Sequence, residues 1–132
     1  MKEITTVAAK CANCEQSFSH PSFGDFSYGE DVLSTVDGKH FATVNAFDEF
    51  PQRVAALAGQ SPIWPVLASL ADPIAAQRLT ASIRCPHCGS AHLEYWGGHK
   101  TGVAVVPAAT FVSAATLSKD ALVASIAAVT GA

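Results

Sequence analysis

The sequence is poor in charged residues. Only 14% of its 132 residues are charged, whereas soluble domains usually have about 25%. The eight lysines and arginines are scattered along the chain, and the formal net charge is −3. Because proteins hold the phosphates of nucleic acids with clustered lysines and arginines, this distribution argues against a nucleic-acid-binding surface.

The sequence favours neither a secretory signal nor a membrane span, and we expect neither. The first residues include Lys2 and Glu3 but no apolar stretch of the kind that a secretory signal requires. Residues 101–118 carry no charge and are nearly long enough to span a bilayer. Pro107 interrupts this stretch, however, and small or hydroxylated residues outnumber the large aliphatic ones. We therefore expect a pair of buried strands there, and a cytoplasmic protein.

The size and hydrophobic content suit one folded unit. The chain has the length of an ordinary domain, and 49% of its residues are hydrophobic, which is enough for a substantial core. No internal repeat, linker or low-complexity tail is visible. We expect a single domain that spans residues 1–132.

The four cysteines form two C-x2-C pairs, Cys11 with Cys14 and Cys85 with Cys88. Disulfides are not expected, because reducing compartments keep thiols free. A redox-active motif would need only one such pair. Two pairs supply the four thiolates of a tetrahedral zinc site, so the sequence predicts one structural zinc ion bound by all four cysteines. The alternative is a set of four unconnected buried thiols.

The second pair lies in the sequence CPHCG, which matches the CPxCG knuckle of rubredoxin-like zinc-ribbon proteins. The chain resembles this family over about a third of its length, near residues 3–17 and 79–97. The first pair, CANCE, departs from the pattern, because Ala12 replaces the proline and Glu15 replaces the glycine. The resemblance implies a β core with two knuckles that share one zinc ion.

The knuckles are unusually far apart. Seventy residues, 15–84, separate them, whereas paired zinc knuckles typically lie about 15–20 residues apart. Closing such a loop costs on the order of 4 kcal/mol, and structural zinc binding contributes roughly 10–16 kcal/mol. The fold class that we predict is α+β: a zinc-ribbon β core with an inserted β-hairpin and short helices, and a C-terminal helix.

Turn and cap signals divide the insertion into short elements. Asp37-Gly38 lies between two β-rich runs, which is typical of a tight hairpin. Three short helices are then predicted. The signals for their starts are the acids before Pro51, Ser61-Pro62 and Asp72-Pro73. The segments on either side of the second knuckle, LTASIRC and HLEYW, are expected to form the ribbon hairpin.

After the ribbon, strands are predicted over 103–106 and 110–114, on either side of Pro107. Ser118 is expected to cap a last helix. Leu122, Ile126 and Val129 should face the core from this helix, because they recur at helical spacing.

No catalytic motif is complete. The sequence HLE at 92–94 resembles part of a zinc-deaminase signature, but a fourth thiol fills the site here. The sequence GGHKTG at 97–102 lacks glycines that a phosphate-binding loop requires, and no nucleophile-elbow motif is present. We expect a protein that is not an enzyme.

Acidic residues are concentrated in one segment that is also rich in aromatic residues. Residues 15–50 hold seven acids and a single base, Lys39. Such a segment suits a basic protein partner, because charge steers the encounter and aromatic side chains anchor it. The alternative is a solvated acidic face whose aromatic residues lie in the core. The residues that we predict to contact the partner are Phe23, Asp25, Phe26, Tyr28, Glu30, Asp31, Asp48 and Glu49.

Two function classes follow. The first is a non-catalytic, zinc-bound protein-interaction module that neutralises a basic partner, in the manner of the immunity proteins that inhibit toxins; charge and size are the basis of this analogy. The second is a nucleic-acid-binding or transcription-associated protein, as many zinc ribbons are.

The histidines keep several roles open. His20 could replace a thiolate as a metal ligand, and His87 lies inside the second knuckle. His92 and His99 flank an aromatic pair and could line a binding surface, but ordinary surface or core positions are the favoured interpretation.

Overall fold

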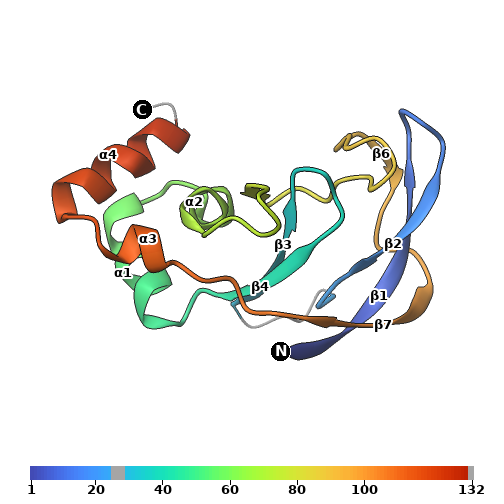
Figure 1. Ribbon diagram of the computed structural model, residues 1–132, viewed down its shortest axis with the longest axis horizontal. Helices are drawn as coiled ribbons and strands as arrows, with labels where there is room; N and C mark the ends of the chain where they lie inside the picture. The colour runs from blue at the N-terminus through green and yellow to red at the C-terminus, as the bar shows by residue number, and fades with distance from the viewer. Residues whose placement is uncertain (25–28, 131–132) are drawn as a thin grey trace.

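A computed structural model describes residues 1–24 and 29–130. The fold is α+β, as predicted, with two antiparallel sheets and a group of helices at one end of the molecule (Figure 1). The strands and helices, in chain order, are β1 Lys2–Cys11, β2 Ser17–Pro21, β3 Glu30–Thr35, β4 Phe41–Asn45, α1 Glu49–Ala58, α2 Ile63–Leu70, β5 Leu79–Thr80, β6 Leu93–Tyr95, β7 Lys100–Val106, α3 Val112–Ala115 and α4 Lys119–Thr130.

The first sheet is built around the long strand β1. Along one edge β1 pairs with β2, from Thr6↔Pro21 to Lys10↔Ser17. Along the other edge its first half pairs with β7 and its end pairs with β6. Segments from both halves of the sequence therefore meet on one strand, which brings the two C-x2-C pairs to the same end of the sheet.

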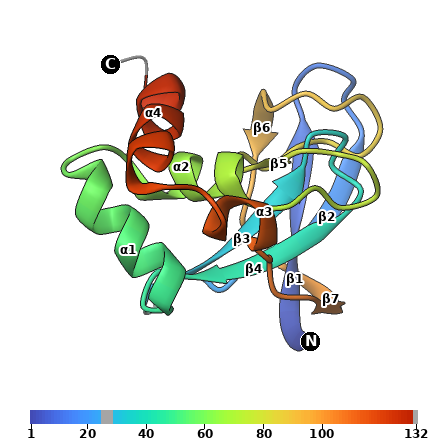
Figure 2. The same ribbon diagram turned by 60° about the vertical axis from the view of Figure 1, so that its left-hand side comes forward.

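The second sheet, in the order β4-β3-β5, carries the main hydrophobic core. Leu33 and Val44 face the helices from this sheet, and all four helices contribute side chains to the cluster. Its buried members include Val54, Val66, Leu67, Ala114, Leu122 and Ile126. Figure 2 shows the helices gathered at the end of the molecule opposite to β1 and β7.

The two sheets are joined by the chain that follows β7. The backbone N–H of Thr43 donates to the oxygen of Pro107 at 2.8 Å, and that of Ala109 donates to the oxygen of Thr43 at 2.7 Å. The chain thus passes from the edge of the first sheet along β4 before it enters α3. Helix α4 lies at one end of the molecule and strand β1 at the other (Figures 1 and 2).

Several local predictions are confirmed. β3 and β4 form the hairpin around Asp37-Gly38, although Thr35 donates its N–H to the oxygen of His40, so the connecting loop is longer than two residues. α1 ends at Gly59, and α2 begins one residue later than predicted, after Pro62. The Ser118 hydroxyl accepts a hydrogen bond from the N–H of Ala121, which makes it the N-cap of α4.

The predicted ribbon hairpin is wrong. β5 pairs with β3 in the second sheet, and β6 pairs with the end of β1 in the first, so the two segments that flank the second knuckle do not pair with each other. Leu79 of β5 is buried in the helical core. Burial of this leucine stabilises the pairing of β5 with β3 and separates it from β6.

Two further predictions near the helices are also wrong. Residues 73–78 form a turn, with a bridge between Ile74 and Gln77, instead of a third short helix. Residues 112–115 form α3 instead of a strand. The carboxylate of Asp72 accepts hydrogen bonds from the N–H groups of Val112 and Ser113, which stabilises the start of α3. In the turn, Ala75 and Ala76 have positive φ angles, which a right-handed helix does not allow.

The predicted core stripe of α4 is partly wrong. Leu122 and Ile126 are buried, but Val129 is 38% exposed.

Within the part of the chain that the structure describes, no helix combines the length and apolar character needed to cross a membrane. The uncharged stretch 101–118 is divided between β7, an irregular segment and α3.

Candidate metal centre

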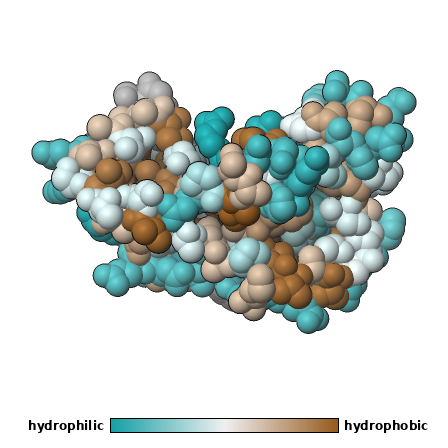
Figure 3. All heavy atoms as spheres, in the orientation of Figure 1, coloured by the Kyte–Doolittle hydropathy of each residue, from teal (hydrophilic) through white to brown (hydrophobic). Residues whose placement is uncertain are grey.

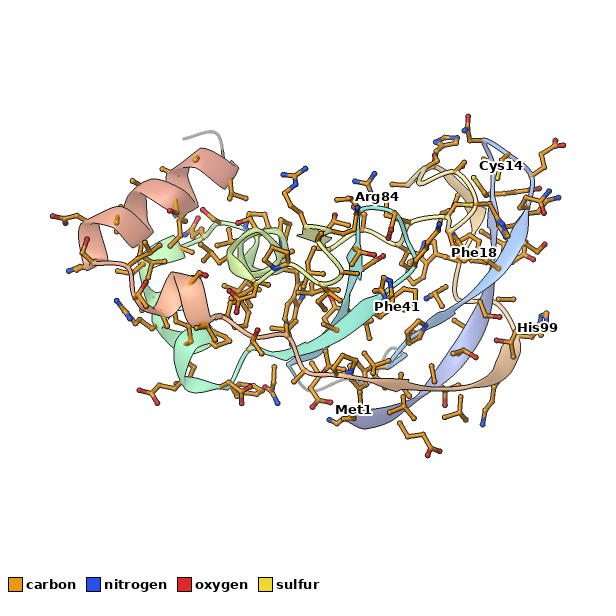
Figure 4. All side chains as sticks on the ribbon, viewed as in Figure 1. Met1, Cys14, Phe18, Phe41, Arg84 and His99 are labelled. Carbon is orange, nitrogen blue, oxygen red and sulfur yellow. The ribbon has the colours of Figure 1, made fainter. Side chains whose placement is uncertain are left out.

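The four cysteines converge at the end of the first sheet. Cys11 is the last residue of β1, and Cys14 lies in the turn that leads to β2, while Cys85 and Cys88 belong to the segment between β5 and β6. All four Sγ atoms lie within 4.8 Å of one another. Figure 4 shows Cys14 at the tip of the β1–β2 hairpin, far from α4.

The two knuckles have the same backbone geometry. In the first, Cys11 donates its N–H to the oxygen of Gln16 and accepts the N–H of Glu15 at its own oxygen. In the second, Cys85 makes the equivalent bonds with Ser90 and Gly89. Each knuckle also directs a backbone N–H at its first sulfur: the donor is Cys14 in the first knuckle, at 3.5 Å, and His87 in the second, at 3.4 Å. Such donors stabilise a thiolate.

Glu15 adopts the backbone conformation that Gly89 adopts in the second knuckle. The φ angle is 62° at Glu15 and 77° at Gly89. The departure of CANCE from the family pattern therefore leaves the geometry of the first knuckle intact. The left-handed conformation strains Glu15 sterically, because its Cβ atom crowds the backbone, whereas glycine has no Cβ.

The spacing of the sulfur atoms fits a tetrahedral ion. Cys11 Sγ and Cys88 Sγ are 3.5 Å apart, and Cys14 Sγ and Cys85 Sγ are 3.6 Å apart. A zinc ion with four Zn–S bonds of about 2.3 Å would place its sulfurs roughly 3.8 Å from one another. Both short contacts join one knuckle to the other, so an ion bound here would join two segments that are distant in sequence.

The thiols influence one another's protonation. The backbone N–H of Ser90 and the side-chain amide of Asn13 lower the pKa of Cys88 to about 6. The N–H of Gln16 acts in the same direction on Cys14, but burial and the three neighbouring sulfurs outweigh it and raise the pKa of Cys14 to about 12. Cys88 therefore forms a thiolate readily, whereas burial and the neighbouring sulfurs disfavour a negative charge on Cys14. A bound divalent cation would remove that opposition.

The inserted hairpin supports the second knuckle. A Cβ atom placed on Gly38, at the tip of the β3–β4 hairpin, would lie 2.5 Å from the oxygen of Arg84, which directly precedes Cys85. The Arg84 guanidinium in turn donates through Nη1 to the oxygen of Gly89 at 3.3 Å. The hairpin tip and Arg84 thus hold the second knuckle against the second sheet.

Sequence reasoning did not find these supporting residues. Asn13 donates its amide N–H to the Sγ of Cys88 at 3.7 Å. It lies inside the CANC motif, and Arg84 lies next to CPHCG, so their positions beside the ligands were the only signal. The contact with Gly38 carries no sequence signal, because it depends on how the hairpin folds back.

His20 does not join the metal-binding group. It is buried on β2, where its Nε2 accepts the N–H of Gly97 at 3.4 Å and its Nδ1 lies 3.1 Å from the oxygen of Pro21. This arrangement fits a neutral ring that donates from Nδ1. Burial also lowers the pKa of His20, which favours the neutral form.

The predicted partner-binding residues differ in their exposure and in their contacts. Asp48 and Glu49 are exposed at the start of α1. Glu30 is half-buried and forms an ion pair with Lys2 at 2.5 Å, and Asp31 is half-buried at the start of β3. Phe23 is half-buried, with the Nζ of Lys2 5.5 Å from the centre of its ring. The remaining three predicted contact residues, Asp25, Phe26 and Tyr28, lie outside the described residues.

Comparisons with protein-family models, with curated proteins and with solved structures find no match to this chain. The four-cysteine cluster therefore rests on its own geometry. That cluster fits a zinc-ribbon-like site and could bind one metal ion.

Proposed function

We propose that this chain is a non-catalytic protein-interaction module that one structural zinc ion holds together. The observation that carries the proposal is the convergence of four Sγ atoms from two segments that are 70 residues apart. Four soft thiolates in a tetrahedral arrangement favour zinc over harder cations such as calcium or magnesium.

The donor set argues for a structural ion. Catalytic zinc sites keep one position open for water or substrate, whereas four sulfur ligands fill the tetrahedral shell. Cys11 and Cys85 are fully buried, so two of the four ligands are also closed to solvent. We infer that the protein is not an enzyme, and that it works in a reducing compartment such as the cytoplasm, where thiols remain free to bind metal.

Metal analysis tests this part of the proposal. Protein purified without chelator should contain one zinc ion per chain, and X-ray absorption should show only sulfur neighbours at about 2.3 Å. Replacement of Cys85 by serine should abolish stoichiometric binding. An oxygen neighbour in the wild-type spectrum, or less than half an equivalent of zinc, would contradict a structural four-sulfur site.

The partner that we propose is a basic protein. Asp48 and Glu49 are exposed beside Phe47, which is 65% exposed, and this group would meet a cationic surface with charge and with an aromatic side chain. A small acidic protein of this kind could neutralise a basic toxin, as immunity proteins do. The excess of acids in residues 15–50 supports that reading.

A capture experiment at two salt concentrations tests the partner class. The tagged chain should retain a basic protein, and association should slow as salt rises, because exposed charges are screened over about 10 Å at 0.1 M but about 3 Å at 1 M. Replacement of both Asp48 and Glu49 by lysine should slow association, whereas Asp120→Lys, on the exposed face of α4, serves as the control. Tight binding of DNA or RNA without any protein partner would instead favour the nucleic-acid class.

A further inference from the structure

A cleft of about 900 Å³ lies between the two sheets. On one side its wall consists of His20, Phe23 and Trp96, from β2 and from the segments that follow β2 and β6. On the other side it consists of Asp31 at the start of β3 and of residues 81–83. The volume is in the range of sites that bind drug-sized ligands. Figure 1 shows the course of β2, β3 and β6, which carry or adjoin these lining residues.

Asp31 places a negative charge in this cleft. Its side chain is half-buried, and its Oδ1 accepts the N–H of Val32 at 2.8 Å. Among the described residues the ion pairs join Lys2 to Glu30 and Lys10 to Glu94, so neither neutralises Asp31. Burial raises the pKa of this carboxyl, which is the effect of lost hydration without a compensating cation.

No lysine or arginine in the described lining of the cleft balances this charge. Besides Asp31, the titratable side chains of that lining are His20 and the exposed His92. Lys2, near Phe23, already bonds to Glu30 and covers the Phe23 ring. His20 is held neutral by its hydrogen bonds to Gly97 and Pro21.

Trp96 adds an aromatic surface at the same site. It lines the cleft, yet 65% of its surface is exposed. An exposed tryptophan is the best of the aromatic side chains for stacking on a guanidinium or an ammonium group. An unpaired carboxylate and an open indole in one cleft are complementary to an organic cation.

We propose that this cleft binds a basic side chain of the protein partner, with Asp31 as the counter-ion and Trp96 as the stacking surface. The inference rests on the proposed function, since it names the site where a basic partner is held. The cleft is larger than a single lysine or arginine side chain requires, so it also has room for the flanking backbone.

Titration with short peptides, followed by NMR, tests the cleft without knowledge of the partner. The probes are the blocked tripeptides Ala-Arg-Ala and Ala-Lys-Ala, with the neutral Ala-Gln-Ala as their control. The indole N–H of Trp96 should shift on binding, and that of Trp64, in the helical core, should not. For one ion pair and one stacking contact we expect a Kd on the order of 1 mM.

Variants assign the effect to residues. Asp31→Asn should weaken binding of Ala-Arg-Ala about tenfold, because it removes a charge-assisted hydrogen bond. Trp96→Ala should weaken it several-fold. Asp120→Asn, which changes the net charge equally but lies on α4, should leave the Kd unchanged. Unchanged NMR spectra outside the cleft show that each variant is folded.

Three outcomes would overturn the proposal. One is equal binding of Ala-Gln-Ala and Ala-Arg-Ala, and another is an Asp31→Asn protein that binds as the wild type does. The third is binding of free agmatine without binding of the tripeptides, because the cleft would then take a small amine instead of a protein side chain.

The capture experiment and the peptide titration can fail independently, so they distinguish the cleft assignment from the proposed function. If a basic protein is captured through Asp48 and Glu49 and Asp31→Asn has no effect on that capture, the cleft assignment is wrong and the proposed function stands. If the arginine peptide binds through Asp31 but no basic protein is captured, the cleft assignment stands and the proposed function is wrong.

Discussion

A left-handed residue four positions after the first cysteine lets each knuckle turn back toward its sulfurs. Gly89 reaches this conformation without strain, and Glu15 does not. Because the two knuckles otherwise make the same backbone hydrogen bonds, they form a matched pair within one protein. The strain at Glu15 can therefore be measured against the glycine that the other knuckle uses.

We expect Glu15→Gly to raise the free energy of unfolding by about 0.5–1 kcal/mol, because relief of the left-handed strain exceeds the entropy that glycine adds to the unfolded chain. Gly89→Ala should lower it by about 1 kcal/mol. The added methyl group has room, since its nearest neighbour would be the oxygen of Val36 at 3.6 Å. Urea unfolding of the zinc-loaded proteins measures both changes. A destabilising Glu15→Gly would show that the glutamate side chain has a role of its own.

Asp31 should make stability depend on pH. Burial raises its folded-state pKa above the ordinary value of 3.8, so the folded protein binds this proton more tightly than the unfolded chain does. The stabilisation is complete below the unfolded pKa and is lost as pH rises through the folded pKa. Asparagine stays neutral at every pH, so the Asp31→Asn protein keeps this stabilisation. At neutral pH the variant should therefore be more stable than the wild type by on the order of 1 kcal/mol.

The measurement is the difference in unfolding free energy between the wild type and Asp31→Asn, followed from below pH 3.8 to neutral pH. His20 and His92 share the cleft with Asp31 and are present in both proteins, so their contributions to the difference largely cancel. A difference that stays constant with pH would contradict an uncompensated carboxylate.

The β3–β4 hairpin holds no cysteine, but its tip lies against the second knuckle of the candidate metal centre. Its tip residue Gly38 has a φ of 75°, and an added Cβ would meet the backbone of Arg84 and Cys85. Gly59, after α1, has a similar φ of 62° but no atom within 4 Å of an added Cβ. The two glycines thus separate the cost of the backbone conformation from the cost of the close contact.

We expect Gly59→Ala to cost about 1 kcal/mol, from conformation alone. Gly38→Ala should cost at least 1 kcal/mol more, and it should also weaken zinc affinity, because the second knuckle must shift. Competition with a colorimetric chelator measures the affinity. Equal zinc affinities in the two variants would show that the hairpin tip does not position the knuckle.

Elements that depend on neighbouring residues could be predicted from the sequence, and those that depend on distant ones could not. Gly59 and Ser118 mark helix ends through local backbone chemistry, and the hairpin signal at Asp37-Gly38 is equally local. The pairing of β5 with β3 is set by burial of Leu79 under helices elsewhere in the chain. α3 depends on Asp72, whose carboxylate lies about forty residues earlier in the sequence.

The same distinction applies to the sites. The four cysteines could be identified because thiol chemistry and spacing alone suggest their role. The cleft could not be identified, because Asp31 and Trp96 come to line one cavity only when the two sheets meet. From the sequence, Asp31 was predicted only as one of several acids that contact a partner, and no role was predicted for Trp96.

Over the whole molecule, the hydrophobic core is unevenly distributed. The helices and the second sheet bury Leu33, Leu67 and Leu122, whereas much of the buried apolar surface of β1 comes from Ile4 and two alanines. The other strands of the first sheet leave hydrophobic residues at the surface, including Val103 and Val105 on β7 (Figure 3). Because this core is so thin, we expect the layer to depend on the proposed metal ion for much of its stability.

Removal of the metal should therefore affect the two layers differently. After chelation we expect amide hydrogen exchange at Ala8 and Ala9 to accelerate strongly, and exchange at Val54 and Leu67 to remain slower. Exchange measured by NMR before and after chelation gives the comparison. Equal acceleration in both layers would mean that the protein unfolds as one unit, and no change would show that the metal is not needed for stability.

The separation of the knuckles also has a consequence during protein synthesis. Cys14 leaves the ribosome well before Cys85, and at about 5–20 residues per second the second pair follows roughly 4–14 s later. Throughout that interval the nascent chain offers only half of a coordination shell. If the four cysteines bind one metal ion, as we propose, that ion can be fully coordinated only after Cys88 has been synthesised.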